Sequence, residues 1–526
     1  MRISGAKAVI NTLKEQGVEV VFGYPGANIA PLYDELKKSG IRHVLTRSEQ
    51  AAGHAACGYA ASGKKTCVCF ATSGPGAVNL ITAVANASAD SVPMVIFTGQ
   101  VETGRIGTDA FQEADITGAT MPFSKYNFLI KNPSDIIRNV REAFYIASTG
   151  RKGPVLIDIP FNIQTEEIDT DDEAAEFDLP GYKVPGNPKL KELNEAANLI
   201  NQASKPLIVA GGGVFASGAE EALKLFMESF NIPAVYSMMG RGAVASEKLN
   251  LGMAGVYGSD FANKAVIDSD LLILAGSRAT ERTLMGINKK SVHIDIDPAE
   301  QGKNIDSLGV TGDLKAALNA LMLLVKRKEQ SIKKEPENLG FHEGLDPIYF
   351  FSILSDNLKD EIITADVGQN LIWALKGIKD SKRIIMSGGL GAMGFALPAA
   401  IGAATESKKD GVVICGDGGF QMSLSELATA ASLKLNLKVI IMDNSSLGMI
   451  RELQKDEYNE NYSAVDLTGP KLKYIAKAYG ASYGEISKNE EAENELGKMM
   501  NTEGIYILRV ITDPDESAFR GQHHGR

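Results

Sequence analysis

The sequence has few of the features that mark disulfide-stabilised, membrane-spanning or nucleic-acid-binding proteins. It contains one tryptophan and four cysteines, with neither a CxxC pair nor a disulfide-framework spacing. Its longest apolar runs, such as LLILAG and VIIM, are far too short to cross a bilayer. The net charge of −11 argues against a nucleic-acid partner, because phosphate binding needs clustered Lys and Arg. We therefore expect a cytoplasmic protein, in a reducing compartment, without a membrane partner.

The chain is too long for a single core, and its pattern predicts three α/β domains. A chain of 526 residues usually divides into several domains. Two hydrophilic stretches, 164–188 and 326–347, are typical of solvated linkers. Between them, short apolar strands alternate with helix-period segments, which predicts consecutive doubly wound parallel sheets. The expected domains cover residues 1–165, 188–330 and 345–520.

Two polar clusters, GDGG (416–419) and DNSS (443–446), each follow an apolar strand in the last block. Ligands of open parallel sheets lie at the carboxyl ends of the strands, so both clusters are expected in a site. Asp417 and Asn444 offer the oxygen ligands that Mg²⁺ prefers, and the glycines let backbone N–H groups approach phosphate. No Lys-Ser or Lys-Thr follows the glycines, which excludes a P-loop. The alternative is a tight turn in which Asp417 only caps a helix.

The spacing of these clusters resembles the GDG…NN signature of enzymes that use thiamine diphosphate (thiamine pyrophosphate), with Asp443 in place of the first Asn. RSEQAAGHAACGYA, ATSGPGAVNLITAVANASADSVPMVIFTGQV, IGTDAFQEADITG, KGPVLIDIP, ADVGQN, SGGLGAMGFALPAAIGA and LGMIRE, in this order, resemble acetohydroxyacid (acetolactate) synthase large subunits over nearly the whole chain. The resemblance implies thiamine-diphosphate-binding folds at both ends and a Rossmann-like middle domain.

The same resemblance implies the residues that hold the cofactor. Asp417, Asn444 and the backbone carbonyl of Ser446 are the expected Mg²⁺ ligands. The expected contacts of thiamine diphosphate are Pro25, Gly26, Gln369, Gly391, Met393, Gly416, Asp417, Gly418, Gly419, Asn444, Ser446, Leu447, Gly448 and Met449.

Four residues are expected to take part in catalysis. Glu49 matches the family's activating glutamate, whose carboxyl group bonds the cofactor's pyrimidine ring; the alternative is an acid in the first turn of a helix. Met393 matches the apolar residue that packs between the two cofactor rings in the family; the alternative is that it only fills space in the hydrophobic core. Gln100 and Lys125 align with polar residues around the acceptor site, although Lys125 also suits a surface position. We interpret His54 as a packed structural histidine.

The resemblance implies decarboxylation of pyruvate and joining of the remaining two-carbon unit to a second 2-keto acid. The expected substrate residues are Arg105, Arg282, Val367 and Leu453. Leu453 stands where synthases usually have a tryptophan, and Arg105 introduces a cation beside the active centre. These departures leave two alternatives open: another thiamine-diphosphate-dependent decarboxylase or lyase with a more acidic 2-keto acid or an acyl-CoA substrate, and a non-catalytic paralogue.

Other partners follow from the family as well. GGGVFA (211–216) fits a dinucleotide-binding turn, but the acidic residue expected some twenty positions later is missing. FAD in the middle domain therefore stays open against an empty domain. A homodimer or homotetramer with active sites at the subunit interface is expected, and the sequence is silent on a regulatory subunit.

Overall fold

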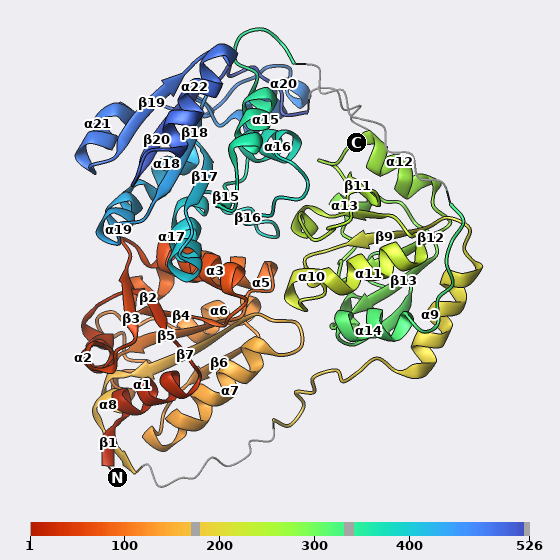
Figure 1. Cartoon of the computed structure of the whole chain (residues 1–526). Coiled ribbons are helices and arrows are strands. Elements are labelled where there is room, and N and C mark those ends of the chain that lie inside the picture. Colours follow the sequence, from red (N-terminus) through yellow and green to blue (C-terminus); the bar gives the residue numbers. More distant parts are fainter. Residues whose placement is uncertain (1, 170–178, 331–340, 520–526) are drawn as a thin grey trace. The chain divides into compact units, whose positions relative to one another are not determined.

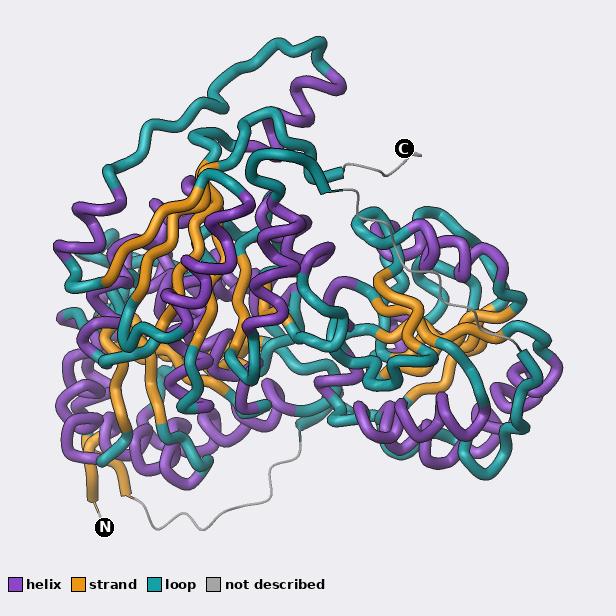
Figure 2. Tube along the Cα trace, turned by 45° about the horizontal axis from the view of Figure 1, so that its top comes forward, coloured by secondary structure: helices purple, strands orange, loops and turns teal. Residues whose placement is uncertain are grey.

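The computed structural model describes residues 2–169, 179–330 and 341–519, and contacts divide the chain into two compact units (Figures 1 and 2). The units comprise Met1–Tyr182, Asp356–Leu371 and Ile385–Glu516 in the first, and Lys183–Ser355, Ile372–Ile384 and Ser517–Arg526 in the second. The first unit holds two six-stranded sheets and the second holds one. The three predicted parallel-sheet α/β domains are therefore confirmed.

The N-terminal sheet has the strand order β3-β2-β4-β5-β7-β6, and its pairings are parallel. Every residue of β4, β5 and β7 is buried, as expected for apolar strands covered on both faces. The strands are β2 (Val20–Tyr24), β3 (Arg42–Leu45), β4 (Cys67–Ala71), β5 (Met94–Gln100), β6 (Tyr126–Leu129) and β7 (Pro154–Pro160). The helices are α1 (Gly5–Glu15), α2 (Ala30–Ser39), α3 (Glu49–Gly63), α4 (Pro75–Asn79), α5 (Ile81–Ala89), α6 (Ile116–Thr120), α7 (Ile136–Ser148) and α8 (Phe161–Thr165), and β1 (Arg2–Ser4) pairs with β8 (Glu167–Asp169).

The C-terminal sheet has the order β16-β15-β17-β18-β20-β19. Its strands are β15 (Ile362–Ala365), β16 (Ile384–Met386), β17 (Gly411–Gly416), β18 (Leu437–Asp443), β19 (Ser482–Ile486) and β20 (Tyr506–Ile511). Its helices are the first residues of α16 (Gln369–Gly377), which continues into the second unit from Ile372 on, and α17 (Ala396–Ser407), α18 (Asp417–Ser423), α19 (Leu427–Ser432), α20 (Gly448–Glu457), α21 (Leu472–Ala478) and α22 (Asn489–Met500). The carboxyl ends of β17 and β18 lead directly into the GDGG and DNSS segments.

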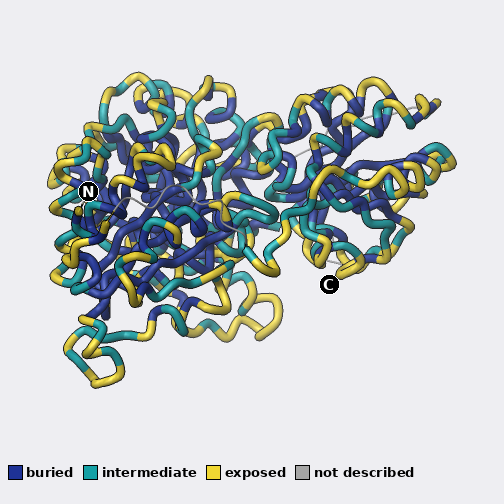
Figure 3. The backbone as a smooth tube through the Cα atoms, turned by 90° about the horizontal axis from the view of Figure 1, so that it is seen from below, coloured by how far each residue is buried: buried dark blue, intermediate teal, exposed yellow. Residues whose placement is uncertain are grey.

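Helices α3 and α17 join the two sheets of the first unit through one hydrophobic core (Figure 1). Both are rich in Ala and Gly, which lets their backbones approach closely. A Cβ at Gly402 would lie 1.7 Å from the carbonyl oxygen of Ala55, and one at Gly58 would lie 2.0 Å from that of Ala399. Larger residues at these two positions would collide with the backbone of the other helix. Figure 3 colours the backbone by the burial of each residue.

The second unit contains the middle sheet, with the order β11-β10-β9-β12-β13-β14. Numbered along the chain, this order is 3-2-1-4-5-6, as in dinucleotide-binding sheets. Its strands are β9 (Pro206–Ala210), β10 (Ala234–Tyr236), β11 (Asn250–Met253), β12 (Leu271–Ala275), β13 (Ser291–Asp295) and β14 (Leu308–Thr311). Its helices are α9 (Leu190–Gln202), α10 (Gly213–Ala216), α11 (Glu220–Phe230), α12 (Asp260–Asp268), α13 (Glu281–Leu284), α14 (Leu314–Leu321) and most of α15 (Pro347–Asn357).

Other sequence expectations can be placed on this structure. Residues 345–355 and 372–384, which the sequence assigns to the C-terminal domain, group with the middle sheet by their contacts; the exact boundaries remain predictions. Parts of both expected linkers, 170–178 and 331–340, lie outside the described residues. All four cysteines are free and buried. Within the described residues, no helix combines the length and apolar character needed to cross a membrane.

Candidate active site

The two expected metal ligands lie at the same edge of the C-terminal sheet. Strands β17 and β18 pair in parallel, with Gly416 opposite Met442. Asp417 therefore begins α18 next to the end of β18, where Asn444 follows. The first N–H groups of α18 have no partner inside the helix, so they can donate hydrogen bonds to phosphate oxygens.

Asn444 is fixed by its neighbours. Its Oδ1 accepts a hydrogen bond from the N–H of Ser446 at 3.0 Å, and its Nδ2 donates to Oε1 of Gln369 at 3.2 Å. A Cβ at Gly448 would lie 1.9 Å from the same Gln369 oxygen, so a larger residue there would displace the Gln369 side chain. Gln369 in turn donates to Oε2 of Glu452 at 2.9 Å. The structure thus brings together three predicted cofactor contacts: Gln369, Asn444 and Gly448.

A second cluster lies over the glycine turn. A Cβ at Gly418 would meet Cδ2 of Leu447 at 3.3 Å and Cε of Met393 at 3.4 Å. Gly391, in the loop that carries Met393, is nearest to Cγ1 of Val367, 3.9 Å from its Cβ position. Met393 therefore reaches toward the predicted diphosphate turn. Met449 and Leu453 lie four residues apart in α20, on one face of that helix.

Glu49 begins α3 in the N-terminal sheet domain and is only 9% exposed. Its Oε2 accepts a hydrogen bond from Nδ2 of Asn79 at 3.0 Å, and its Oε1 would lie 3.0 Å from a Cβ at Gly76. Thr72 fills the space next to Gly76 and Gly26, at distances of 2.8 and 2.5 Å from their Cβ positions. The GYPG and SGPG turns and Glu49 thus form one contiguous group.

The electrostatics at Asp417 suit a cation. Burial, and then the neighbouring Asp443, raise the pKa of Asp417 to about 7. Arg509 opposes this shift but is ion-paired with Asp443 at 2.6 Å. A carboxylate in this setting is stabilised by an added positive charge. A cavity of about 530 Å³ borders Asp417 and Asp443 and is also lined by Lys471, Lys473 and Arg509.

The donor set fits magnesium held together with a diphosphate. Among the described residues, no three or more His, Cys, Asp and Glu side chains are grouped so that they could hold a metal ion. A magnesium–diphosphate site needs only one carboxylate, because amide, carbonyl, phosphate and water oxygens complete the shell. Asp417, Asn444 and the Ser446 carbonyl are such a set, beside a glycine turn that opens onto Met393.

Comparison with known proteins agrees with this geometry. Three family models match: the N-terminal TPP binding domain of thiamine pyrophosphate enzymes at residues 3–119, their central domain at 193–321 and their C-terminal TPP binding domain at 366–510. The acetolactate synthase large subunit of Lactococcus lactis subsp. lactis is 39% identical, over 98% of this chain and 93% of its own length. The acetolactate synthase isozyme 2 large subunit of Escherichia coli is 39% identical, over 98% of this chain and 97% of its own length. The acetolactate synthase of Mycobacterium bovis is 43% identical, over 94% of this chain and 86% of its own length.

The chain belongs to the acetolactate synthase family of thiamine pyrophosphate enzymes.

In this synthase-family chain, two residues predicted to be catalytic are occupied by protein partners. The Gln100 amide donates to the carbonyl of Ala114 at 2.8 Å and to Oδ2 of Asp158 at 2.9 Å, and its oxygen accepts from the N–H of Val101. The ammonium group of Lys125 bonds the carbonyls of Ile146 and Thr149 and the hydroxyl of Tyr182. These contacts support structural roles, and a catalytic role for either residue stays a prediction.

The remaining predicted residues lie in different settings. The Arg105 side chain is 70% exposed and pairs with Glu102 at 3.7 Å. His54 is buried, contacts the Phe395 ring edge-on at 5.3 Å, and has its pKa lowered to about 4 by burial. A neutral, packed His54 agrees with the structural interpretation.

The middle domain of the synthase-family chain contains the candidate FAD turn and Arg282. Arg282 Nη1 donates to the Tyr257 hydroxyl at 2.7 Å. The glycine turn packs closely against the end of β12: Cβ atoms at Gly211 and Gly213 would lie 2.2 and 2.6 Å from Gly276 atoms. Close backbone packing is therefore one reason for these glycines, and FAD binding stays open.

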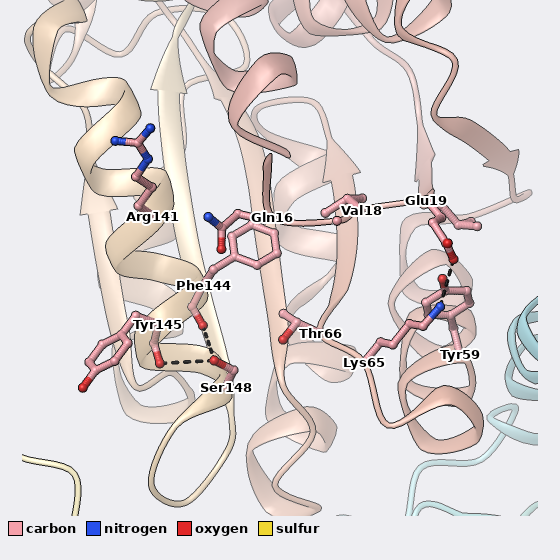
Figure 4. Close-up of a pocket in the computed structure, with 12 residues that line it drawn as sticks. Gln16, Val18, Glu19, Tyr59, Lys65, Thr66, Arg141, Phe144, Tyr145 and Ser148 are labelled. Carbon is pink, nitrogen blue, oxygen red and sulfur yellow. Dashed lines mark hydrogen bonds and ion pairs between the residues drawn. The ribbon is translucent and has the colours of Figure 1, made fainter. Parts of the chain in front are cut away.

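A further cavity of about 450 Å³ lies at the opposite, amino end of the N-terminal sheet (Figure 4). None of the predicted site residues lines it. Its Lys65 is ion-paired with Glu19 and its Arg141 with Glu15, each at 2.9 Å. Because parallel-sheet ligands bind at carboxyl ends, this cavity is not the expected active site.

Sequence reasoning missed four residues that support the site. Asn79 holds Glu49 and Thr72 packs beside it, while Ser387 and Asp366 bond the loop that carries Met393. Burial raises the pKa of Asp366 to about 6, opposed by the N–H groups of Ala396, Gly394 and Phe395. A polar residue in an otherwise apolar motif, such as Asp366 in ITADVG, was the available signal.

Proposed function

We propose that this protein converts two molecules of pyruvate to 2-acetolactate and CO₂, with thiamine diphosphate and Mg²⁺ as cofactors. The observation that carries the proposal is the convergence of Asp417, Asn444, the glycine turn and Met393 in a chain 39–43% identical to acetolactate synthases. Bound thiamine diphosphate supplies the nucleophilic carbon for a 2-keto acid and accepts the electron pair left when CO₂ departs.

The chain's own residues take distinct roles in this proposal. Asp417, Asn444 and the Ser446 carbonyl hold Mg²⁺, and the N–H groups of Gly418 and Gly419 bind diphosphate oxygens. Met393, whose Cε lies 3.4 Å from the Cβ position of Gly418, would contact the cofactor rings beside the glycine turn. Glu49 holds a proton in a hydrogen bond to the pyrimidine ring. Its burial beside Thr72 and Gly76 excludes water and strengthens that bond.

The side chain at position 453 should discriminate only weakly in favour of a longer acceptor keto acid, so pyruvate can serve as the acceptor as well. Leu453 is 41% exposed on α20 and stands where synthases usually have a tryptophan. The positive charge of Arg105 favours a second candidate, a decarboxylase or lyase for a more acidic 2-keto acid, because a guanidinium group can bind an additional substrate carboxylate. This side chain is 70% exposed and pairs with Glu102 at 3.7 Å. Pyruvate as both donor and acceptor is the function that the sequence identity to synthases supports best.

We further infer a homodimer or dimer of dimers in the cytoplasm. Large apolar side chains are exposed around both halves of the site: Val78 near Glu49 is 46% exposed, Phe111 is 89% exposed, and Met422, beside the Met393 loop, is 67% exposed. A protein interface at the site would bury these side chains. A second copy would cover them and bring the Glu49 of one chain to the cofactor held by the other. The relatives named large subunits support a smaller partner chain as well.

Product analysis tests the proposal. Purified protein, reconstituted with thiamine diphosphate and Mg²⁺, is supplied separately with pyruvate, 2-ketobutyrate and 2-oxoglutarate, and CO₂ release and acetolactate are measured. We expect one CO₂ per acetolactate from pyruvate. Turnover of 2-oxoglutarate without turnover of pyruvate would replace the proposal with the acidic-substrate alternative. No turnover of any substrate would favour a non-catalytic paralogue.

A further inference from the structure

The loop that carries Met393 has no regular secondary structure of its own. It connects β16 to α17 over residues 387–395, and two of its glycines, Gly391 and Gly394, have left-handed φ angles of +80° and +78°. The N–H groups of such a loop cannot bond within a helix or a strand ladder, so their partners must come from elsewhere in the protein. The position of Met393 depends on those partners.

Two buried side chains hold the loop on either side of Met393. Oγ of Ser387 accepts hydrogen bonds from the N–H groups of Gly391 at 3.1 Å and Ala392 at 2.8 Å. The carboxylate of Asp366 accepts from Gly394 at 3.0 Å and Ala396 at 2.7 Å. Ser387 and Asp366 are each 1% exposed. Four N–H groups that flank Met393 are therefore fixed by two buried side chains, of which Asp366 also packs against Gly419 of the glycine turn.

The N-terminal sheet domain holds the same loop through helix α5. The hydroxyl of Ser387 donates its single proton to Oδ1 of Asn86, which is also 1% exposed. One turn further along, Oδ1 of Asp90 accepts the N–H of Gly389 at 2.7 Å. Asn86 and Asp90 lie four residues apart and so share one face of the segment that ends α5. The donated proton orients Ser387 so that its lone pairs face Gly391 and Ala392.

We propose that Asn86 and Asp90 of the N-terminal sheet domain, acting through Ser387 and Gly389, are positioning residues for Met393 in the C-terminal domain. Asp366 completes the clamp from the other side. The effect of the clamp on cofactor binding rests on the proposed function, in which Met393 contacts the cofactor. The clamp makes the two domains of one chain jointly responsible for the geometry of one cofactor site.

Hydrogen exchange of the protein without cofactor tests the clamp directly. The variants are Asn86→Ala, Ser387→Ala and the milder Asp90→Asn. The matched control is Ser407→Ala, whose hydroxyl donates to the carbonyl of Ala403 and accepts the N–H of Lys409 at the end of α17, away from the Met393 loop. We expect peptides spanning 388–396 to exchange at least tenfold faster in Asn86→Ala and Ser387→Ala, and severalfold faster in Asp90→Asn. The Ser407→Ala variant should match the wild type.

A second readout separates positioning from general destabilisation. Calorimetry should show thiamine diphosphate binding about tenfold more weakly to Ser387→Ala, and Ser387→Thr, which retains a hydroxyl, should restore most of the affinity. If the variants fold and exchange at residues 388–396 is unchanged, the proposal is wrong. If exchange rises as expected but no variant, including the wild type, binds thiamine diphosphate or turns over pyruvate, the clamp stands and the proposed function fails. If Asn86→Ala does not fold, the exchange rates of Asp90→Asn and Ser387→Ala test the proposal in its place.

Discussion

At the scale of single residues, the cofactor site depends on a few oxygen atoms held by backbone turns. Asp417 is buried beside the carboxyl group of Asp443, while Asp443 forms an ion pair with Arg509. Asp417 follows β17 and Asp443 ends the adjacent β18, yet only Asp417 is expected to bind a metal. Their difference provides a matched pair of variants.

The substitution Asp417→Asn should abolish tight binding of thiamine diphosphate with Mg²⁺, since the one carboxylate ligand is lost. We expect an affinity loss of about a hundredfold or more. Asp443→Asn should bind the cofactor nearly as well as the wild type, because Asp443 is not a ligand. Isothermal calorimetry measures both. Equal losses in the two variants would contradict the assignment of Asp417.

The substitution Glu49→Gln should separate binding from catalysis. The amide keeps the shape of the side chain and can still contact Asn79, but it cannot hold the proton that the proposal assigns to the carboxyl group. We expect kcat to fall by about 10²–10⁴ while cofactor affinity changes little. Steady-state acetolactate formation and calorimetry give the two values. The exposed Glu490→Gln in α22 is the control, and turnover at the wild-type rate in Glu49→Gln would remove Glu49 from the mechanism.

At the scale of secondary-structure elements, the packing of α3 on α17 holds the two halves of the first unit together. Gly58→Ala places a methyl group 2.0 Å from a backbone oxygen and should destabilise the protein by about 1–3 kcal/mol or more. Gly497 in α22 has open space around it, so Gly497→Ala should stabilise by up to about 1 kcal/mol. Urea unfolding measures both. Opposite signs are expected, and a neutral Gly58→Ala would contradict the close approach of the helices.

Strand β7 carries a buried carboxyl group whose ionisation should limit stability at high pH. Burial raises the pKa of Asp158 to about 7, although Thr98 and Gln100 bond it. Because the folded protein holds this proton more tightly than the unfolded chain, the stabilisation is present at acidic pH and is lost as pH rises toward 7. Between pH 5 and 7 the wild type should lose up to about 2–3 kcal/mol relative to Asp158→Asn. Parallel unfolding profiles for the two proteins would rule this out.

At the scale of the whole molecule, the sequence predicted the three α/β domains and the placement of Asp417 and Asn444 at one edge of the C-terminal sheet, because both depend on local patterns. GDGG and DNSS lie at the carboxyl ends of two buried strands that pair in parallel, and this pairing alone places Asp417 and Asn444 at one edge of the sheet. The clamp around Met393 could not be predicted in this way. Asn86 and Ser387 are far apart in sequence, and the packing of the N-terminal and C-terminal sheet domains of the first unit brings them together. The full occupation of Gln100 and Lys125 by backbone and side-chain partners was likewise invisible in the motifs.

The central claim concerns two copies of the chain: Glu49 of one completes the site that Asp417 and Asn444 build in the other. Co-expressing Glu49→Gln and Asp417→Asn chains with different tags, and purifying dimers that carry both tags, tests it most directly. Each variant alone should be inactive. In a mixed dimer one site receives both substitutions and the other receives none, so we expect about half of the wild-type acetolactate activity. Mixed dimers that fold and assemble but show no more activity than either variant alone would contradict the account.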